Sequence, residues 1–267
     1  MRHDYKGTFL ESFKDIKNNP ILLVPDLLLV ISTTVLTSLF LYINGLLKGT
    51  TLNAEHFTKF AVETFNSAPL LTKFILSLVI LAVINIFFGI TFNIMKYVMI
   101  RDLVEYRREP NILESYYEVR EYLFPVLGIK AILVALYLLP FIVFTFLSLK
   151  NNLLIIISPI VVLGIWAFLK VSFLFIYPTL MIKTRKGIIT TFRETYQYFK
   201  RNRLHALICA AIVFLTSVLA TYLLTLIGKL ITNYITISSV ASLYTLISTL
   251  AIIIIWVWGL VFLFKNY

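Results

Sequence analysis

Residues 238–264 read SSVASLYTLISTLAIIIIWVWGLVFLF, a run of 27 residues without a single charge. A helix needs about 20 mostly apolar residues to cross a bilayer. Five further stretches meet this requirement, so we predict six membrane-spanning helices. They lie at about 21–45, 74–98, 123–148, 153–182, 205–232 and 238–264. The fold class is therefore all-α: a polytopic membrane helix bundle.

The composition supports the same class. Of 267 residues, 60% are hydrophobic and only 14% are Asp, Glu, Lys or Arg, with a mean hydropathy of +0.91. This is too little charge to cover the surface of a water-soluble domain of this size. The net charge of +11 lies mainly beside the apolar stretches, where it indicates topology and contact with anionic headgroups. We expect no nucleic acid partner, because the basic stretches alternate with acids.

The distribution of basic residues predicts the orientation of the chain. Residues 1–20, 100–122 and 183–204 together contain 15 Lys and Arg residues. The connections on the opposite side contain five: Lys48, Lys59, Lys73, Lys150 and Lys229. We therefore expect a multi-pass protein of the cell membrane with both termini in the cytoplasm. The single cysteine and the lack of a targeting segment suit a prokaryotic membrane.

The three basic stretches resemble one another. In register they read TFLESFKDIKNN (8–19), NILESYYEVREY (111–122) and TFRETYQYFKRN (191–202). Each places Thr or Asn three residues before Glu, the spacing of a capping box at a helix start. The capping pairs are Thr8 with Glu11, Asn111 with Glu114, and Thr191 with Glu194.

Large apolar residues recur at the same three offsets in each segment. They are Phe9, Phe13 and Ile16; Ile112, Tyr116 and Val119; and Phe192, Tyr196 and Phe199. One apolar stripe on a charged helix is typical of a helix at a membrane interface. A basic residue follows each stripe, at Lys17, Arg120 and Lys200, where it complements the helix dipole. With Arg201 and Arg203, these are the candidate headgroup-binding residues.

Each amphipathic segment precedes two predicted spans. We interpret residues 1–267 as a single integral membrane domain of three pseudo-repeats, about 1–98, 105–182 and 188–267, each an interfacial helix followed by a helical hairpin. The other interpretation is that interfacial helices resemble one another because they obey the same physics. A further short amphipathic helix is predicted within 46–73, with Asn53 as its cap, Pro69 as its stop, and Phe57, Phe60, Ala61 and Phe65 at helical spacing.

Residues 171–204, VSFLFIYPTLMIKTRKGIITTFRETYQYFKRNRL, resemble a group of uncharacterised six-helix membrane proteins that is classed with the membrane domain of glycerophosphoryl diester phosphodiesterases. The matching positions are Pro178, Gly187, Thr191, Phe192, Thr195, Tyr196, Lys200 and Asn202. The run TFLESFKDIKNNP, ending at Pro20, is similar to that group's opening helix. The resemblance implies a membrane anchor or accessory module, and it does not imply phosphodiesterase chemistry.

Polar residues inside the predicted spans are candidates for a site, because charge within a bilayer is costly. We select Asp26, Asn85, Asn93, Lys130 and Lys170 as candidates for a polar pocket open to the cytoplasm. In one interpretation Asp26 pairs with Lys130 or Lys170. In the other, both lysines extend to the headgroups and the asparagines join helices.

No catalytic motif accompanies these residues. His3, His56 and His205 are dispersed, and Cys209 is the one cysteine, so we expect no enzyme activity, metal or cofactor. The function we predict is a non-catalytic membrane module that organises lipid or membrane partners through its cytoplasmic interfacial helices. The expected partners are anionic headgroups and a membrane protein or a second copy of the chain. The alternative is a transporter of small solutes or lipid that uses the polar pocket.

Overall fold

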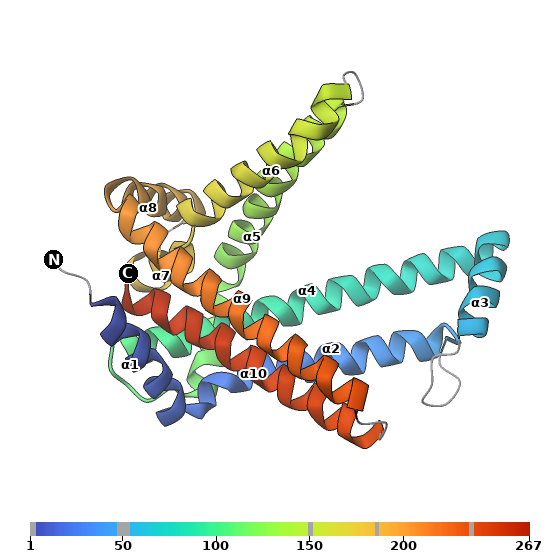
Figure 1. The fold of residues 1–267 in the computed structure, drawn as a ribbon, viewed down its shortest axis with the longest axis horizontal. Helices are drawn as coiled ribbons and strands as arrows, with labels where there is room; N and C mark the ends of the chain where they lie inside the picture. The colour runs from blue at the N-terminus through green and yellow to red at the C-terminus, as the bar shows by residue number, and fades with distance from the viewer. Residues whose placement is uncertain (1–3, 47–53, 149–151, 185–186, 235–237) are drawn as a thin grey trace. The chain divides into compact units, whose positions relative to one another are not determined.

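The computed structural model describes residues 4–46, 54–148, 152–184, 187–234 and 238–267, and most of these are helical, with no strand among them (Figure 1). The elements are α1 (Tyr5–Asn18), η1 (Pro20–Leu23), α2 (Val24–Ile43), α3 (Ala54–Asn66), α4 (Ala68–Val104), α5 (Ile112–Ser148), α6 (Asn152–Ser172), α7 (Ile176–Pro178), η2 (Thr179–Thr184), α8 (Ile188–Arg201), α9 (Arg203–Tyr234) and α10 (Ser238–Lys265).

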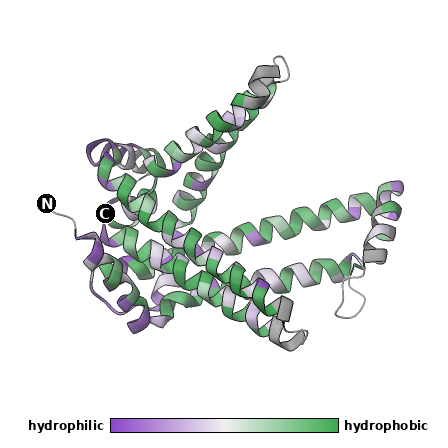
Figure 2. Cartoon of the chain, in the orientation of Figure 1, coloured by the Kyte–Doolittle hydropathy of each residue, from purple (hydrophilic) through white to green (hydrophobic). Residues whose placement is uncertain are grey.

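Six helical segments are long and apolar enough to cross a membrane, as predicted. They are Pro20–Ile43, Ala68–Val104, Ile112–Leu147, Ile157–Lys183, Arg203–Ile231 and Ser242–Lys265. Many large apolar side chains on them are exposed, including Ile31, Val83 and Phe214, which fits surfaces that face lipid. Hydrophobic residues cover the long helices, whereas hydrophilic residues gather on α1 and α8 (Figure 2). The protein is an all-α polytopic membrane protein.

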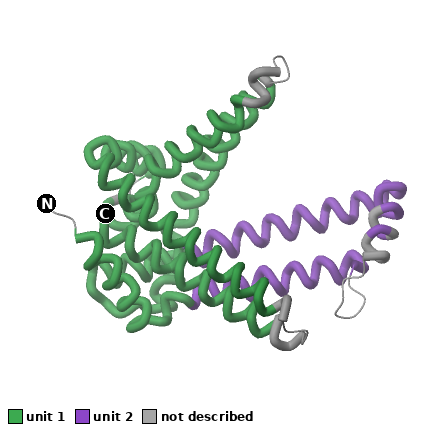
Figure 3. The backbone as a smooth tube through the Cα atoms, in the orientation of Figure 1, with its two compact units in different colours: residues 1–23, 94–267 green, residues 24–93 purple. Residues whose placement is uncertain are grey.

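The chain divides into two compact units (Figure 3). Residues 1–23 and 94–267 form the first, in which α5 pairs with α6, α9 pairs with α10, and α1 packs on α10. Its buried core contains Trp258, Phe175 and Phe262.

The second unit, residues 24–93, contains α2, α3 and most of α4. Phe74 of α4 contacts Phe40 of α2 and Phe60 of α3, each with ring centroids 5.6 Å apart. Asn44 donates a hydrogen bond of 3.1 Å to the Ser77 hydroxyl.

The predicted helix between the first two spans is confirmed as α3. Its predicted cap, Asn53, and the side chains of Phe57 and Ala61 lie outside the described residues. Pro69 does not stop this helix: α3 ends at Asn66, and Pro69 lies in the first turn of α4. Proline suits a first turn because its missing N–H would have no partner there.

Two of the three predicted helix caps are wrong, because the helices begin four residues earlier. Asp4 caps α1 by accepting from the Gly7 amide at 2.9 Å, and the residue that precedes α8 is Gly187. The hydroxyls of Thr8 and Thr191 instead donate to the carbonyls of Asp4 and Gly187. In the second segment Asn111 does cap α5, accepting from the Leu113 amide at 2.9 Å.

The three segments share a hydrogen bond from a side-chain hydroxyl to a backbone carbonyl, made by a residue outside the predicted apolar stripe. A small hydroxyl residue lies four positions after Thr8, Asn111 and Thr191, and it donates to the carbonyl of that residue. The pairs are Ser12 to Thr8 at 2.7 Å, Ser115 to Asn111 at 2.6 Å, and Thr195 to Thr191 at 2.8 Å. All three hydroxyl residues are buried, as are the next residues on the same face, Ile16, Val119 and Phe199. The buried face is therefore narrower and more polar than the stripe predicts.

The second segment is not a separate surface helix, contrary to the prediction. α1 and α8 end at the matching residues Asn19 and Asn202, whose side-chain amides donate to the carbonyl four residues back at 3.0 and 3.2 Å. The matching residue of the second segment is Tyr122, and there α5 continues into the membrane span as one helix of 37 residues. In the first segment Pro20, which has no backbone N–H to continue a helix, follows Asn19 directly.

Trp258 attaches α1 to α10. Its side chain is fully buried, and its indole N–H donates to the Phe9 carbonyl at 3.2 Å. Its ring stacks on Phe13 at 5.1 Å and meets Phe9 edge-on at 4.8 Å. Lys265, near the end of α10, adds ion pairs to Glu11 and Asp15 of α1 at 3.1 and 2.7 Å.

Replacing this tryptophan should release α1. We expect Trp258→Ala to lower the free energy of unfolding by about 3–5 kcal/mol, the usual cost of emptying a buried aromatic site. Thermal unfolding in detergent and hydrogen exchange of the α1 amides are the measurements. Trp256→Ala is the matched control, since that ring is 64% exposed two residues away. Equal α1 protection in both variants would contradict this role of Trp258.

Candidate functional site

The polar-pocket candidates are divided between the two units. Asp26, Asn85 and Asn93 belong to residues 24–93, whereas Lys130 and Lys170 belong to the other unit. The pairing of Asp26 with either lysine therefore stays a prediction.

Their individual environments differ. Asp26 is buried, Lys130 is half-buried, and Lys170 is exposed, as expected of a lysine that extends toward headgroups. Asn93 donates to the Gly89 carbonyl of its own helix. The buried side-chain oxygen of Asn85 has no hydrogen-bond partner among the described residues.

The headgroup candidates all have exposed side chains. They are Lys17 on α1, Arg120 on α5, Lys200 and Arg201 on α8, and Arg203 at the start of α9. Because the opposite face of each segment is buried, these cations can contact a membrane surface without losing contacts inside the protein. This arrangement matches the predicted amphipathic character of the segments.

Two cations are buried that the sequence does not identify as site candidates. Lys96 lies near the end of a predicted span and is only 3% exposed. Arg101 was counted only as a basic residue of a connecting segment, yet it too is 3% exposed. Acidic residues close to Arg101 in the sequence were an available signal, but nothing in their spacing distinguishes a buried ion pair from a solvated one.

Arg101 joins the end of α4 to the start of α5. Its guanidinium donates to both carboxylate oxygens of Glu118 at 2.9 and 3.0 Å and to Asp102 at 2.6 and 3.0 Å. It also donates to the Tyr122 hydroxyl at 3.2 Å and lies 5.2 Å from the ring centre of Tyr106. A planar guanidinium can satisfy several acceptors at once, so this ion-pair cluster connects the end of one span to the start of the next.

We expect Arg101→Gln to lower the stability of the protein by on the order of 3 kcal/mol, because Glu118 and Asp102 then lose a buried partner. The melting temperature in detergent measures this. Arg120→Gln is the control: it removes the same charge from an exposed position, where about 0.5 kcal/mol or less is usual. Equal melting temperatures for the two variants would show that the Arg101 ion pairs contribute nothing to stability.

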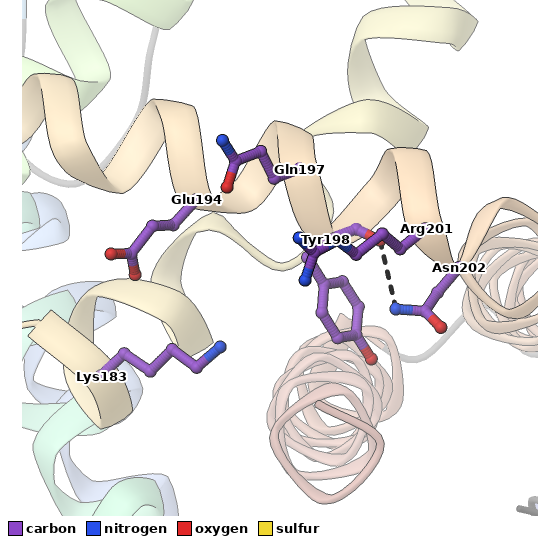
Figure 4. A pocket seen from close by; sticks show the side chains of 6 residues that line it. All are labelled: Lys183, Glu194, Gln197, Tyr198, Arg201 and Asn202. Carbon is purple, nitrogen blue, oxygen red and sulfur yellow. Dashed lines mark hydrogen bonds between the residues drawn. The ribbon is translucent and has the colours of Figure 1, made fainter.

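A polar groove lies along α8. It encloses about 380 Å³ and is lined by Lys183, Glu194, Gln197, Tyr198, Arg201 and Asn202 (Figure 4). Lys183 comes from η2, and the other residues come from α8 and its C-cap. The α8 residues 197, 198 and 201 follow residue 194 by three, four and seven positions, which places all four on one side of the helix.

The helical path changes where Lys183 enters the groove. α6 ends at Ser172, and the chain continues through α7 to η2, a segment with a wider helical turn. Pro178 closes α7 and has no backbone N–H to continue a regular helix. Wider turns of this type occur often at functional sites. Here the segment brings a cation at the end of the fourth span next to α8.

A network of hydrogen bonds and ring contacts holds Tyr198, one of the residues that line the groove. The Tyr198 hydroxyl and the His205 Nε2 both donate to the Asn266 carbonyl, at 3.2 and 2.7 Å. The other His205 nitrogen, Nδ1, accepts from the Tyr5 hydroxyl at 2.8 Å. Phe175 stacks on the His205 ring and meets the Tyr198 ring edge-on. Residues from both chain ends and from α8 are thus fixed around one carbonyl.

Tyr198 is held as a neutral hydrogen-bond donor. Its pKa is raised to about 12, mainly by burial, with nearby titratable groups, Cys209 foremost, acting in the same direction. It therefore stays protonated at physiological pH and keeps its bond to Asn266. The Tyr267 ring packs 5.0 Å from the Tyr198 ring and 5.5 Å from the Lys183 ammonium.

Comparison of the chain with protein-family models, curated proteins and solved structures gives no match. The functional interpretation therefore rests on the chemistry of the site. Within the described ranges no three His, Cys, Asp or Glu residues are grouped as metal ligands would be. The groove instead presents ammonium, guanidinium and amide groups, which bind anions.

Proposed function

We propose that this protein is a non-catalytic integral membrane module that organises anionic lipid through its surface segments on the cytoplasmic side. The surface segments are α1, the first turns of α5, and α8. The observation that supports this function is their two-sided character. Each buries a narrow face, while its basic residues, Lys17, Arg120 and Lys200 among them, are exposed. Basic residues near a membrane surface each contribute about 1 kcal/mol to binding anionic lipid.

Neutralising one cation on each segment tests this function. In the variant Lys17→Gln, Arg120→Gln, Lys200→Gln, we expect less enrichment of anionic lipid around the protein because three headgroup contacts are lost. The measurement is the fraction of spin-labelled phosphatidylglycerol in vesicles whose motion is restricted by the protein.

The control removes three lysines predicted on the opposite side, Lys59, Lys73 and Lys229. It should leave the restricted fraction close to that of the unmodified protein. An equal effect of both triple variants, or no effect of either, contradicts the proposal.

Burial of Asp26 favours a second candidate function, transport of a small solute. If Asp26 binds a solute, that solute should raise the melting temperature of the protein, and Asp26→Asn should abolish the rise. A screen of polar metabolites against both proteins tests this. A rise that persists in Asp26→Asn would exclude Asp26 as the binding group.

A further inference from the structure

The groove along α8 presents two cations to an anion. Lys183 and Arg201 are exposed, and neither forms an ion pair with a carboxylate in the part of the chain that the structure describes. Glu194 is the one carboxylate among the described lining residues, so cations outnumber carboxylates there. Two cations on one groove attract an anion.

The lining also offers the donors that phosphate oxygens need. Arginine binds phosphate in a forked geometry and lysine binds it as a point charge. Gln197 and Asn202 add two side-chain amides. One N–H of the Asn202 amide is held by the Tyr198 carbonyl at 3.2 Å, and this bond fixes the orientation of the amide group. In Figure 4 the Lys183 ammonium lies across the groove from the α8 side chains.

The position of the groove indicates where such an anion comes from. Lys183 is the last residue of the fourth candidate span, and Arg203, one residue beyond Asn202, is the first of the fifth. The groove is thus bounded by two span ends, the level at which lipid phosphates lie in a bilayer. Beyond Asn202, the apolar side chains Leu204 and Leu207 are 72% and 52% exposed, a surface suited to acyl chains.

The size of the groove agrees with a headgroup. A volume of about 380 Å³ holds a small polar group, near the lower end of the range for ligand pockets. It is too small for a whole lipid, whose acyl chains would remain in the bilayer. Tyr198, which lines the groove, is held in place by its hydrogen bond to the Asn266 carbonyl.

We propose that this groove binds the phosphodiester group of one membrane phospholipid, with Lys183 and Arg201 on the phosphate oxygens and Gln197 and Asn202 as further donors. This inference rests on the proposed lipid-organising function and adds one defined binding site to it.

Native mass spectrometry of the full chain, titrated with phosphatidylglycerol, tests the site. We expect Lys183→Gln, Arg201→Gln to weaken binding of the first lipid about tenfold or more, since two charge-assisted bonds are lost. The matched control is Arg107→Gln, Arg108→Gln, which removes two exposed charges from the connection between α4 and α5 that do not line the groove. Its effect should be within about threefold, below 1 kcal/mol.

Gln197→Glu is a second variant that keeps both cations and the side-chain shape. The added carboxylate should weaken phosphatidylglycerol binding, with the melting temperature in detergent unchanged because this residue is exposed.

Three results would overturn the site. One is equal weakening in the groove variant and its matched control, which would show general electrostatics. Another is inorganic phosphate displacing phosphatidylglycerol at equal concentration, which would indicate a soluble ligand. The third is unchanged binding in both the groove variant and Gln197→Glu. None of these depends on the spin-label result for Lys17, Arg120 and Lys200, so the site and the wider function can fail separately.

Discussion

A surface helix that precedes a membrane span must either end or continue into the span, and this choice shapes the surface segments of this protein. Asn19 and Asn202 end α1 and α8, and each donates both its backbone N–H and its side-chain amide to one carbonyl of the last turn. A new helical segment then begins after each of them. Tyr122 occupies the matching position of the second segment, and α5 runs on unbroken. The two segments with asparagine at this position form separate surface helices, and the segment with tyrosine there forms one helix with its span.

The surface segments are then fixed by different contacts. α1 is held by the Trp258 indole and the Lys265 ion pairs, and α8 by the bond from Tyr198 to the Asn266 carbonyl. The start of α5 is held by Arg101. These contacts are polar or aromatic rather than simply apolar. This is expected where a helix meets both lipid and water, because aromatic rings with one polar atom suit that boundary.

The sequence was sufficient to predict the six spans, the class of fold and the presence of α3, because each depends on local hydrophobicity and spacing. The caps at Thr8 and Thr191 were wrong for a physical reason. A threonine three residues before a glutamate fits a cap, but its hydroxyl can equally donate to a carbonyl one turn back inside a helix. The direction of that bond depends on where the helix begins, and Asp4 and Gly187 decide it.

The groove could be predicted only in part. Arg201 was selected as a headgroup contact from its position after the apolar stripe. Lys183 and Gln197 were not selected, because their contribution depends on η2 lying beside α8, which no local pattern contains. The burial of Arg101 was missed for a related reason: whether a charge near a span end is buried depends on partners supplied by another helix.

A density map of the protein in nanodiscs containing phosphatidylglycerol would show whether the groove holds a lipid phosphate. We expect phosphate density in the groove, within hydrogen-bonding distance of the Lys183 ammonium and the Arg201 guanidinium. A map that resolves headgroups elsewhere around the surface segments, but none between these two side chains, would contradict it.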